Sequence, residues 1–382
     1  MADDLITETV TTGWGGRIVR SLLGALIGLA LVAGSLWLLW WNEGRAVDAA
    51  RALDRGARSV ISVTPDNPGA APDGSLVHVI GHAASPTPLR DTLFGVQRDD
   101  ALRLRRVVEM YQWHEDKKTE TTRDLGGKET QTTVYSYRMA WSDQPQDSTK
   151  FQQRRGHGNP SMPARGALIE AGDARIGAIK LTNAVLSGLD SFQPMAHPTP
   201  TPRNFREAED WLYRGADPLA PAVGDLRVRY EVVPAQTVSV VAQLRIGILT
   251  PHRDANGYEI SLIKPGTETA AKMFGAARQE EALMTWILRG VGFLLGLCGF
   301  WLMYGPLSTI FAVVPFLEDM VGIGTFFLAL PCALFTSATT IAIAWFAHRP
   351  ILTGVILLCG AGAAIAATWS RRSARRPLPI RT

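Results

Sequence analysis

The sequence predicts an integral membrane protein. It has four predicted transmembrane α-helices, one N-terminal and three C-terminal. A large strand-rich α+β extracytoplasmic domain lies between the first and second of them in the sequence. The main observation is four long runs without a charged residue, and the second is a central region rich in alternating apolar and polar residues. A helix of about 20 residues spans roughly 30 Å, the thickness of the hydrocarbon core. The four runs are residues 21–41, 290–317, 320–347 and 350–370.

The first run is predicted to be a lasting anchor and not a cleaved signal peptide. It is longer than the usual apolar region of a signal peptide, which has about 7–15 residues. The residues after it, Trp40-Trp41-Asn42-Glu43, lack the small-x-small pattern of a cleavage site. A weak candidate site follows at residues 47–50. Trp37, Trp40 and Trp41 suit the aromatic belt at a membrane interface.

Basic residues at both ends of the chain predict its orientation. Arg17 and Arg20 precede the first run, and a cluster beginning at Arg371 follows the last. Basic residues favour the cytoplasmic side, and four crossings return the chain to the side where it began. The domain is therefore expected in the periplasm of a bacterium, held at the inner membrane. The alternative is the lumen of the endoplasmic reticulum and inner nuclear membrane. The Ala-, Arg- and Gly-rich composition without a glycosylation sequon favours the bacterial alternative.

The order of segments follows from these runs and their flanks. Apolar residues at three- and four-residue steps in 45–59 and 268–285 predict helical stalks that continue the first and second membrane helices. The predicted segments are a cytoplasmic N-terminus (1–17), transmembrane helix 1 (18–41), the extracytoplasmic domain with stalks at both ends (42–285), transmembrane helix 2 (286–304), a cytoplasmic or interfacial loop (305–321), transmembrane helices 3 (322–346) and 4 (350–370), and a basic cytoplasmic tail (371–382).

Alternating residues inside the domain predict strands. Residues 76–80, 102–113, 133–141, 226–232, 237–249 and 258–263 have this pattern or high β-branched content. The polar stretch 119–132, which contains Gly126-Gly127, is expected to be a long hairpin loop. Residues 166–189 are expected to contain one or two helices with a strand. Four prolines between 194 and 202 mark an exposed connector.

Cofactor and metal sites are not expected. The three cysteines, at positions 298, 332 and 359, fall in predicted membrane helices, so the domain has no thiol for a disulfide or a zinc site. His78 and His82 are four residues apart on a predicted strand, which separates them by about 13 Å, too far to share an ion. A net charge of +4 without a dense basic stripe argues against nucleic acid as a partner.

Two residues could support a membrane-tethered hydrolase. His157 lies in Gly156-His157-Gly158, where two glycines more simply indicate a turn. Glu109 stands between apolar and aromatic residues, where a buried carboxylate needs a partner such as arginine. A structural ion pair is the simpler expectation. The domain holds neither a Gly-x-Ser-x-Gly elbow nor a cysteine.

The membrane helices give little indication of transport. No charged residue lies near the middle of a run, which argues against a pump. A pore formed by several copies stays open as an alternative, with Ser337, Thr339 and Thr340 as lining hydroxyls, although helix packing is the simpler explanation for them. The pairs Gly24 and Gly28, and Gly292 and Gly296, have the small-xxx-small spacing of closely packed helices.

Several sequence words together resemble the transmembrane protein 43 family, also called LUMA. They include Trp-Asn-Glu-Gly-Arg after the first run, Val-Glu-Met-Tyr-Gln-Trp at 108–113, Gly-His-Gly-Asn-Pro-Ser at 156–161 and Gly-Asp-Leu-Arg-Val at 224–228. The resemblance covers nearly the whole chain and includes the one-plus-three helix order. The positions that carry it are Trp41, Asn42, Glu43, Gly44, Arg45, Glu109, Met110, Tyr111, Gln112, Trp113, His157, Asn159, Pro160, Gly224 and Asp225.

The resemblance implies placement and partnership more than chemistry. Animal members look like membrane-organising proteins of the endoplasmic reticulum and inner nuclear membrane that self-associate and bind emerin and lamins. We therefore expect a non-enzymatic scaffold in a lipid bilayer, a homo-oligomer with protein partners. Emerin- and lamin-like partners are expected only in a eukaryote. The family supplies no catalytic residues to transfer.

Overall fold

The computed structural model describes residues 6–196 and 198–349. The predicted fourth span (350–370) and basic tail (371–382) lie outside these residues. The chain forms two compact units. We call Met1–Thr12, Ala52–Asp124 and Lys128–Gln279 the sheet unit, and Gly13–Arg51, Leu125–Gly127 and Glu280–Thr382 the helix unit. The described part of each unit is treated separately below.

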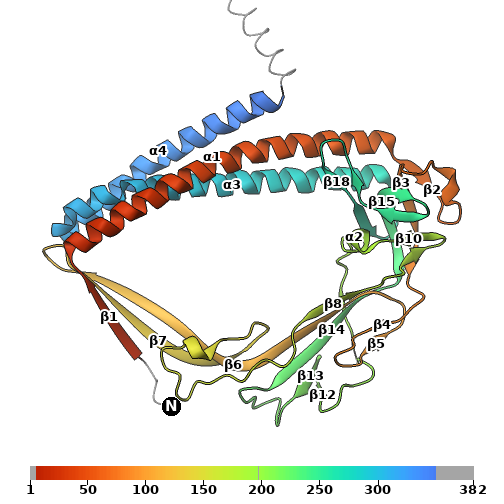
Figure 1. The fold of residues 1–382 in the computed structure, drawn as a ribbon, viewed down its shortest axis with the longest axis horizontal. Coiled ribbons are helices and arrows are strands. Elements are labelled where there is room, and N and C mark those ends of the chain that lie inside the picture. Colours follow the sequence, from red (N-terminus) through yellow and green to blue (C-terminus); the bar gives the residue numbers. More distant parts are fainter. Residues whose placement is uncertain (1–5, 197, 350–382) are drawn as a thin grey trace, which may run out of the picture. The chain divides into compact units, whose positions relative to one another are not determined.

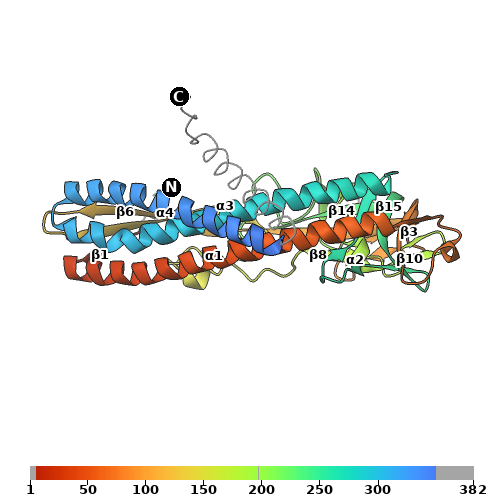
Figure 2. The ribbon, with the colours of Figure 1, turned by 90° about the horizontal axis from the view of Figure 1, so that it is seen from above.

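Three long helices dominate the described part of the helix unit (Figure 2). They are α1 (Trp14–Ser59), α3 (Ala270–Ile310) and α4 (Pro315–His348). All three are long and apolar enough to cross a membrane. Both predicted stalks are helical, because α1 continues unbroken to Ser59 and α3 begins at Ala270. The ends of these two helices, residues 52–59 and 270–279, belong to the sheet unit.

Helices α1 and α3 approach closely through small residues. A Cβ on Gly28 would lie 2.5 Å from the backbone oxygen of Gly299, closer than atoms can pack. Ser35 also donates a hydrogen bond of 2.7 Å to the carbonyl of Gly292. The predicted Gly28, Gly292 and Gly296 therefore pack helices of one chain together, whereas Gly24 has no neighbouring atom within 4 Å of the Cβ position.

An eight-stranded, largely antiparallel sheet, sheet A, forms much of the sheet unit (Figure 1). Its two longest strands, β6 (Ala101–Arg123) and β7 (Glu129–Ser142), form one extended hairpin. The path of the sheet is β1 (Ile6–Thr12), β7, β6, β14 (Leu226–Pro234), β13 (Trp211–Arg214) and β12 (Arg206–Ala208), with β11 (Gln193–Pro194) beside β14 and β8 (Ala167–Glu170) beside β6.

A second sheet of seven strands, sheet B, completes the core of this unit. Its order is β19 (Leu262–Pro265), β15 (Gln236–Arg245), β16 (Ile248–Thr250), β10 (Ile179–Leu181), β9 (Arg175–Ile176), β3 (Leu76–Ala84) and β2 (Ile61–Val63). Apolar residues of both sheets and of the short helix α2 (Asn183–Leu186) share one buried cluster. Leu53 at the end of α1 and Phe274 at the start of α3 join a smaller cluster with Leu76 and Val241.

A buried ionic triad lies inside the sheet unit. Arg106 donates to Asp91, and the hydroxyl of Tyr230 donates to the same carboxylate at 2.6 Å. Burial by itself raises the pKa of Asp91, but the hydrogen bonds from Tyr230 and Arg106 outweigh it and hold that pKa below its ordinary value. Burial and the Asp91 carboxylate raise the pKa of Tyr230. The triad ties the loop that follows β4 (Leu89–Arg90) to β6 and β14.

The structure differs from the sequence predictions in three regions. Most of the expected hairpin loop 119–132 is strand, because polar side chains can point to water on both faces of a long hairpin. Residues 166–189 hold three short strands and only a four-residue helix. The expected loop 305–321 is divided between α3, the short helix η3 (Phe311–Val313) and α4, which begins at Pro315, where the missing N–H is tolerated.

Residues 6–12, predicted as part of a separate N-terminal segment, form strand β1 at the edge of sheet A. Seven residue pairs join it to β7, from Ile6 opposite Tyr135 to Thr12 opposite Glu129. Strong β propensity explains the strand, since six of its seven residues are Ile, Val or Thr.

Candidate functional site

Three of the four sequence words that carry the family resemblance meet on sheet A. The first, residues 108–113, lies in β6, where Met110 and Gln112 are fully buried. Gln112 uses its amide on neighbouring backbone, donating to the carbonyl of Gln144 at 2.7 Å and accepting from the N–H of Gln146 at 2.9 Å. The polar side chain of Gln112 is thus bonded to the main chain and not directed at a cleft.

The second word, residues 224–228, supplies the turn at the start of β14. The N–H of Tyr111 donates to the carbonyl of Asp225, and the N–H of Gly224 donates to the carbonyl of Tyr111, both at 2.9 Å. Gly224 has φ +99°, a conformation that favours glycine. The Asp225 carboxylate accepts hydrogen bonds from Ala222 N–H and the Tyr213 hydroxyl. Burial and this carboxylate raise the pKa of Tyr213 to about 12, so the phenol stays neutral and donating.

The third word contains Asn159, whose side chain acts as a strand partner for β6. Its Oδ1 accepts from the N–H of Trp113 at 2.8 Å, and its Nδ2 donates to the carbonyl of Trp113 at 2.9 Å. Next to it, the ring of Pro160 lies 3.1 Å from the Cβ position of Gly224. The words at 108–113, 156–161 and 224–228 therefore form one packed region, which we call the motif region.

His157 lies within an aromatic cluster of the motif region. Its ring stacks on Tyr137 with centroids 4.0 Å apart and meets the edge of Trp113 at 4.6 Å. Only 4% of the residue is exposed. Tyr137 in turn donates to Glu115 at 2.8 Å. The imidazole ring of His157 is thus packed between aromatic side chains of the sheet.

Glu109 forms the ion pair expected from sequence. Its Oε2 lies 2.5 Å from Nε of Arg227 on the neighbouring strand β14. The guanidinium of Arg227 also lies over the rings of Trp141 and Trp211, at 4.6 and 4.4 Å from their centroids. Such cation–π contacts hold the arginine in place between two aromatic faces. Sequence reasoning missed Trp141 and Trp211, because cross-strand neighbours depend on register.

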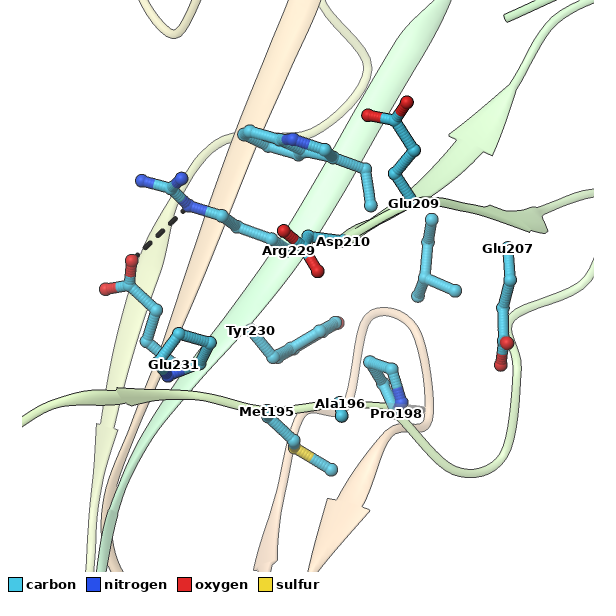
Figure 3. A pocket seen from close by; sticks show the side chains of 12 residues that line it. Met195, Ala196, Pro198, Glu207, Glu209, Asp210, Arg229, Tyr230 and Glu231 are labelled. Atoms are coloured by element: carbon cyan, nitrogen blue, oxygen red, sulfur yellow. Dashed lines mark ion pairs between the residues drawn. The ribbon is translucent and has the colours of Figure 1, made fainter.

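A pocket of about 210 Å³ lies beside this arginine stack (Figure 3). Glu207, Glu209 and Asp210 stand on its rim, and Arg229 pairs with Glu231 at 3.3 Å on one side. None of the described residues that line it is a serine, cysteine or histidine. Among these described residues the lining therefore offers carboxylates and aromatic surface without a paired nucleophile and base. Its residues are Pro194, Met195, Ala196, Pro198, Glu207, Glu209, Asp210, Trp211, Leu212, Arg229, Tyr230 and Glu231.

The fourth word, Trp-Asn-Glu-Gly-Arg, lies in α1 within the helix unit, where it joins α1 to α3. Glu43, whose side chain is 2% exposed, receives two hydrogen bonds from Arg289, at 2.7 and 2.9 Å. Asn42 donates to the carbonyl of Thr285 at 3.1 Å, and Arg45 pairs with Glu281 at 2.5 Å. These charges lie next to the apolar part of the helices, where an unpaired charge would be strongly unfavourable.

The other two residues of this word also make packing contacts. Trp41 stacks on Trp37 with ring centroids 6.0 Å apart. Gly44 leaves room for the ring of His348, whose nearest atom lies 2.9 Å from the Cβ position of the glycine. Asn42, Glu43, Gly44 and Arg45 thus join helices, whereas Trp41 packs within α1 itself.

Two of the three hydroxyls suggested for a pore have surroundings that the structure describes. Thr340 donates to the carbonyl of Thr336 in its own helix at 2.7 Å. Ser337 is buried, and its Oγ lies 4.0 Å from the Cβ position of Gly296 in α3. Across residues 6–196 and 198–349, no group of three His, Cys, Asp or Glu side chains could hold a metal ion.

Comparison with known proteins identifies relatives over nearly the whole chain. The family model described as transmembrane protein 43 matches residues 110–350. The human protein named transmembrane protein 43 is 31% identical over 359 residues, which cover 89% of this chain and 88% of the human one. The rat protein of the same name is 30% identical over 371 residues, covering 92% and 91%. A Drosophila melanogaster homolog is 30% identical over 350 residues, covering 88% and 92%. No solved structure matches the chain.

Proposed function

Because this chain belongs to the transmembrane protein 43 family, we propose that it is a membrane-anchored scaffold that self-associates and binds protein partners through its sheet unit, and that it is not an enzyme. The helices α1, α3 and α4 provide the attachment to the lipid bilayer. The compartment, whether a bacterial inner membrane or the endoplasmic reticulum and inner nuclear membrane, stays a prediction. Emerin- and lamin-like partners likewise apply only to a eukaryotic source.

The observation that carries this proposal is how the motif residues use their polar atoms. Gln112 and Asn159 bond to backbone, Glu109 pairs with Arg227, and Asp225 bonds to Tyr213 and Ala222. A catalytic group needs a free functional atom facing a substrate. Side chains engaged in this way instead support a rigid sheet, and a rigid surface binds partners with little loss of conformational entropy.

The proposal is tested with the full-length chain in native membranes. Two differently tagged copies are co-expressed, and the membranes are treated with a lysine-reactive crosslinker before one tag is captured. We expect the second tag in the captured fraction, together with reproducible heterologous proteins. A variant with Arg227→Ala and Glu109→Ala, which loosens the motif region, should lose heterologous proteins while remaining inserted. Capture of the monomer alone would contradict the proposal.

A further inference from the structure

Strand β1 leaves one long edge of sheet A open. It is the last strand in the order of the sheet, and on its outer side no strand among residues 6–196 and 198–349 pairs with it (Figure 1). Residues 7–11 are exposed, and Val10 is 49% exposed. The main-chain N–H and C=O groups that point away from β7, on alternate residues of this strand, are therefore a template for a further strand.

The other edges of the two sheets are blunted in the ways natural proteins use. Strand β12 at the far edge of sheet A has three residues, and Glu209 just after it has φ +53°. In sheet B, β2 has three residues, and β19 has four and ends at Pro265. Short strands and prolines prevent unwanted pairing. In contrast, β1 contains no lysine, proline or glycine. An edge of this length with Glu8 as its only charged residue indicates that it is covered in the assembled protein.

We propose that β1 pairs antiparallel with β1 of a second copy of this chain, about a twofold axis at Thr9. The inference rests on the self-association proposed above and assigns the surface responsible. Pairing about Thr9 places Thr7 opposite Thr11 and Glu8 opposite Val10, so no two like charges meet. Because a twofold contact uses the same surface on both partners, such self-complementarity is what a second copy requires.

The side chains favour this partner over an unrelated strand. Thr7, Thr9 and Thr11 lie on one face of β1, and the pairing would set each opposite a threonine. The sheet already uses such pairs on this face, because Thr11 lies opposite Thr130 of β7, which lies opposite Thr122 of β6. Cross-strand threonine pairs stabilise antiparallel sheets. On the other face, Glu8 is held within its own chain by a hydrogen bond of 2.8 Å from the Tyr135 hydroxyl.

Cysteine crosslinking tests the register in the full-length chain in lipid discs, with Cys298, Cys332 and Cys359 replaced by serine. Thr9→Cys should form a disulfide-linked dimer under mild oxidation, because the two residues face each other. Thr11→Cys is the matched control. Its two copies would lie about 13 Å apart along the strand, beyond the reach of a disulfide. A mixture of Thr7→Cys and Thr11→Cys chains should crosslink to each other.

Charged substitutions in β1 test the same contact without a covalent bond. When Thr7, Thr9 and Thr11 are all replaced with lysine, each lysine faces a lysine of the second copy, which makes three pairs of like charges. The affinity of the dimer should then fall roughly a hundredfold. The matching triple-glutamate variant should also form a weakened homodimer. The triple-lysine and triple-glutamate variants, when mixed, should form a heterodimer. Circular dichroism and thermal unfolding of each variant check that the sheet unit remains folded.

The outcomes separate this inference from the proposed function. Dimers that persist in the triple-lysine variant, with no crosslink at Thr9→Cys, would show that β1 is not the contact, while self-association itself would stand. A chain that is monomeric at every concentration in lipid would overturn both. Crosslinking by Thr11→Cys as efficient as by Thr9→Cys would also reject the twofold pairing.

Discussion

The carboxylate of Asp91 accepts hydrogen bonds of 2.6 Å at both of its oxygens from Nη1 of Arg106. The side chains are only 3% and 8% exposed. Removing one partner of a buried pair leaves the other charge uncompensated. We therefore expect Asp91→Asn to lower the free energy of unfolding by about 3–5 kcal/mol. The exposed pair of Asp116 and Arg138 is the control, and Asp116→Asn should change stability by less than about 1 kcal/mol. Chemical denaturation monitored by tryptophan fluorescence measures both, and equal effects would contradict the expectation.

The same pair makes stability depend on pH. The folded-state pKa of Asp91 lies below its ordinary value of 3.8. The stabilisation is therefore complete above that value and is lost as pH falls through the folded-state pKa. We expect the wild-type chain to lose stability below about pH 4, and the difference between wild type and Asp91→Asn to narrow there. Unfolding curves at pH 7, 5, 4 and 3 measure this difference. A constant difference over that range would show that another group controls the acid transition.

Helix contact at Gly28 can be tested against its neighbour Gly24. A Cβ on Gly28 would collide with the backbone of α3, whereas one on Gly24 would meet no atom within 4 Å. Gly28→Ala should therefore destabilise the helix unit by about 1–3 kcal/mol. Gly24→Ala should be neutral or slightly stabilising, because alanine favours helix more than glycine does. Thermal unfolding in detergent compares the two variants. Equal tolerance would mean that α1 and α3 do not meet at Gly28.

The buried pair of Glu43 and Arg289 should be required for the helix unit but tolerant of exchange. Glu43→Gln leaves the guanidinium of Arg289 without its carboxylate and should lower the free energy of unfolding of the helix unit by about 3 kcal/mol. The exchanged chain, with Glu43→Arg and Arg289→Glu, should recover part of that loss. A double-mutant cycle built from the single variants Glu43→Arg and Arg289→Glu and the exchanged chain isolates the pairwise free energy. A coupling near zero would indicate that the two residues act independently.

The pairing of β1 with β7 predicts on which side of the membrane residues 6–12 lie. Two strands joined by backbone hydrogen bonds must lie on the same side of the membrane. The basic flanks of the sequence instead predict that the N-terminus and the domain lie on opposite sides of the membrane. Single cysteines at Thr9 and at Thr132, which are paired in the sheet, report this directly. We expect a membrane-impermeant maleimide to label both from the same side. Labelling from opposite sides would show that β1 does not pair with β7 in the membrane, and would also remove the basis for the twofold contact.

Local pattern was enough to predict some features of the candidate site. Glu109 in an apolar strand required a cationic partner, and Arg227 supplies it. The alternation of β6 and β14 also predicted their strands, because one side of each faces a core, whereas Tyr135 is the only buried residue of the alternating strand β7. Residues 166–189 could not be assigned correctly, since strands of two to four residues are too short for their period to be recognised.

The sequence by itself determined the membrane character, three of the long apolar helices seen in the structure and the family, because these depend on composition, length and the identity of short words. Only the tertiary structure decided that the words at 108–113, 156–161 and 224–228 pack together, since strand register brings distant residues into contact. It also decided that residues 6–12 extend sheet A. Backbone hydrogen bonds between strands do not depend on side-chain type, so no local pattern could identify β7 as the partner of β1.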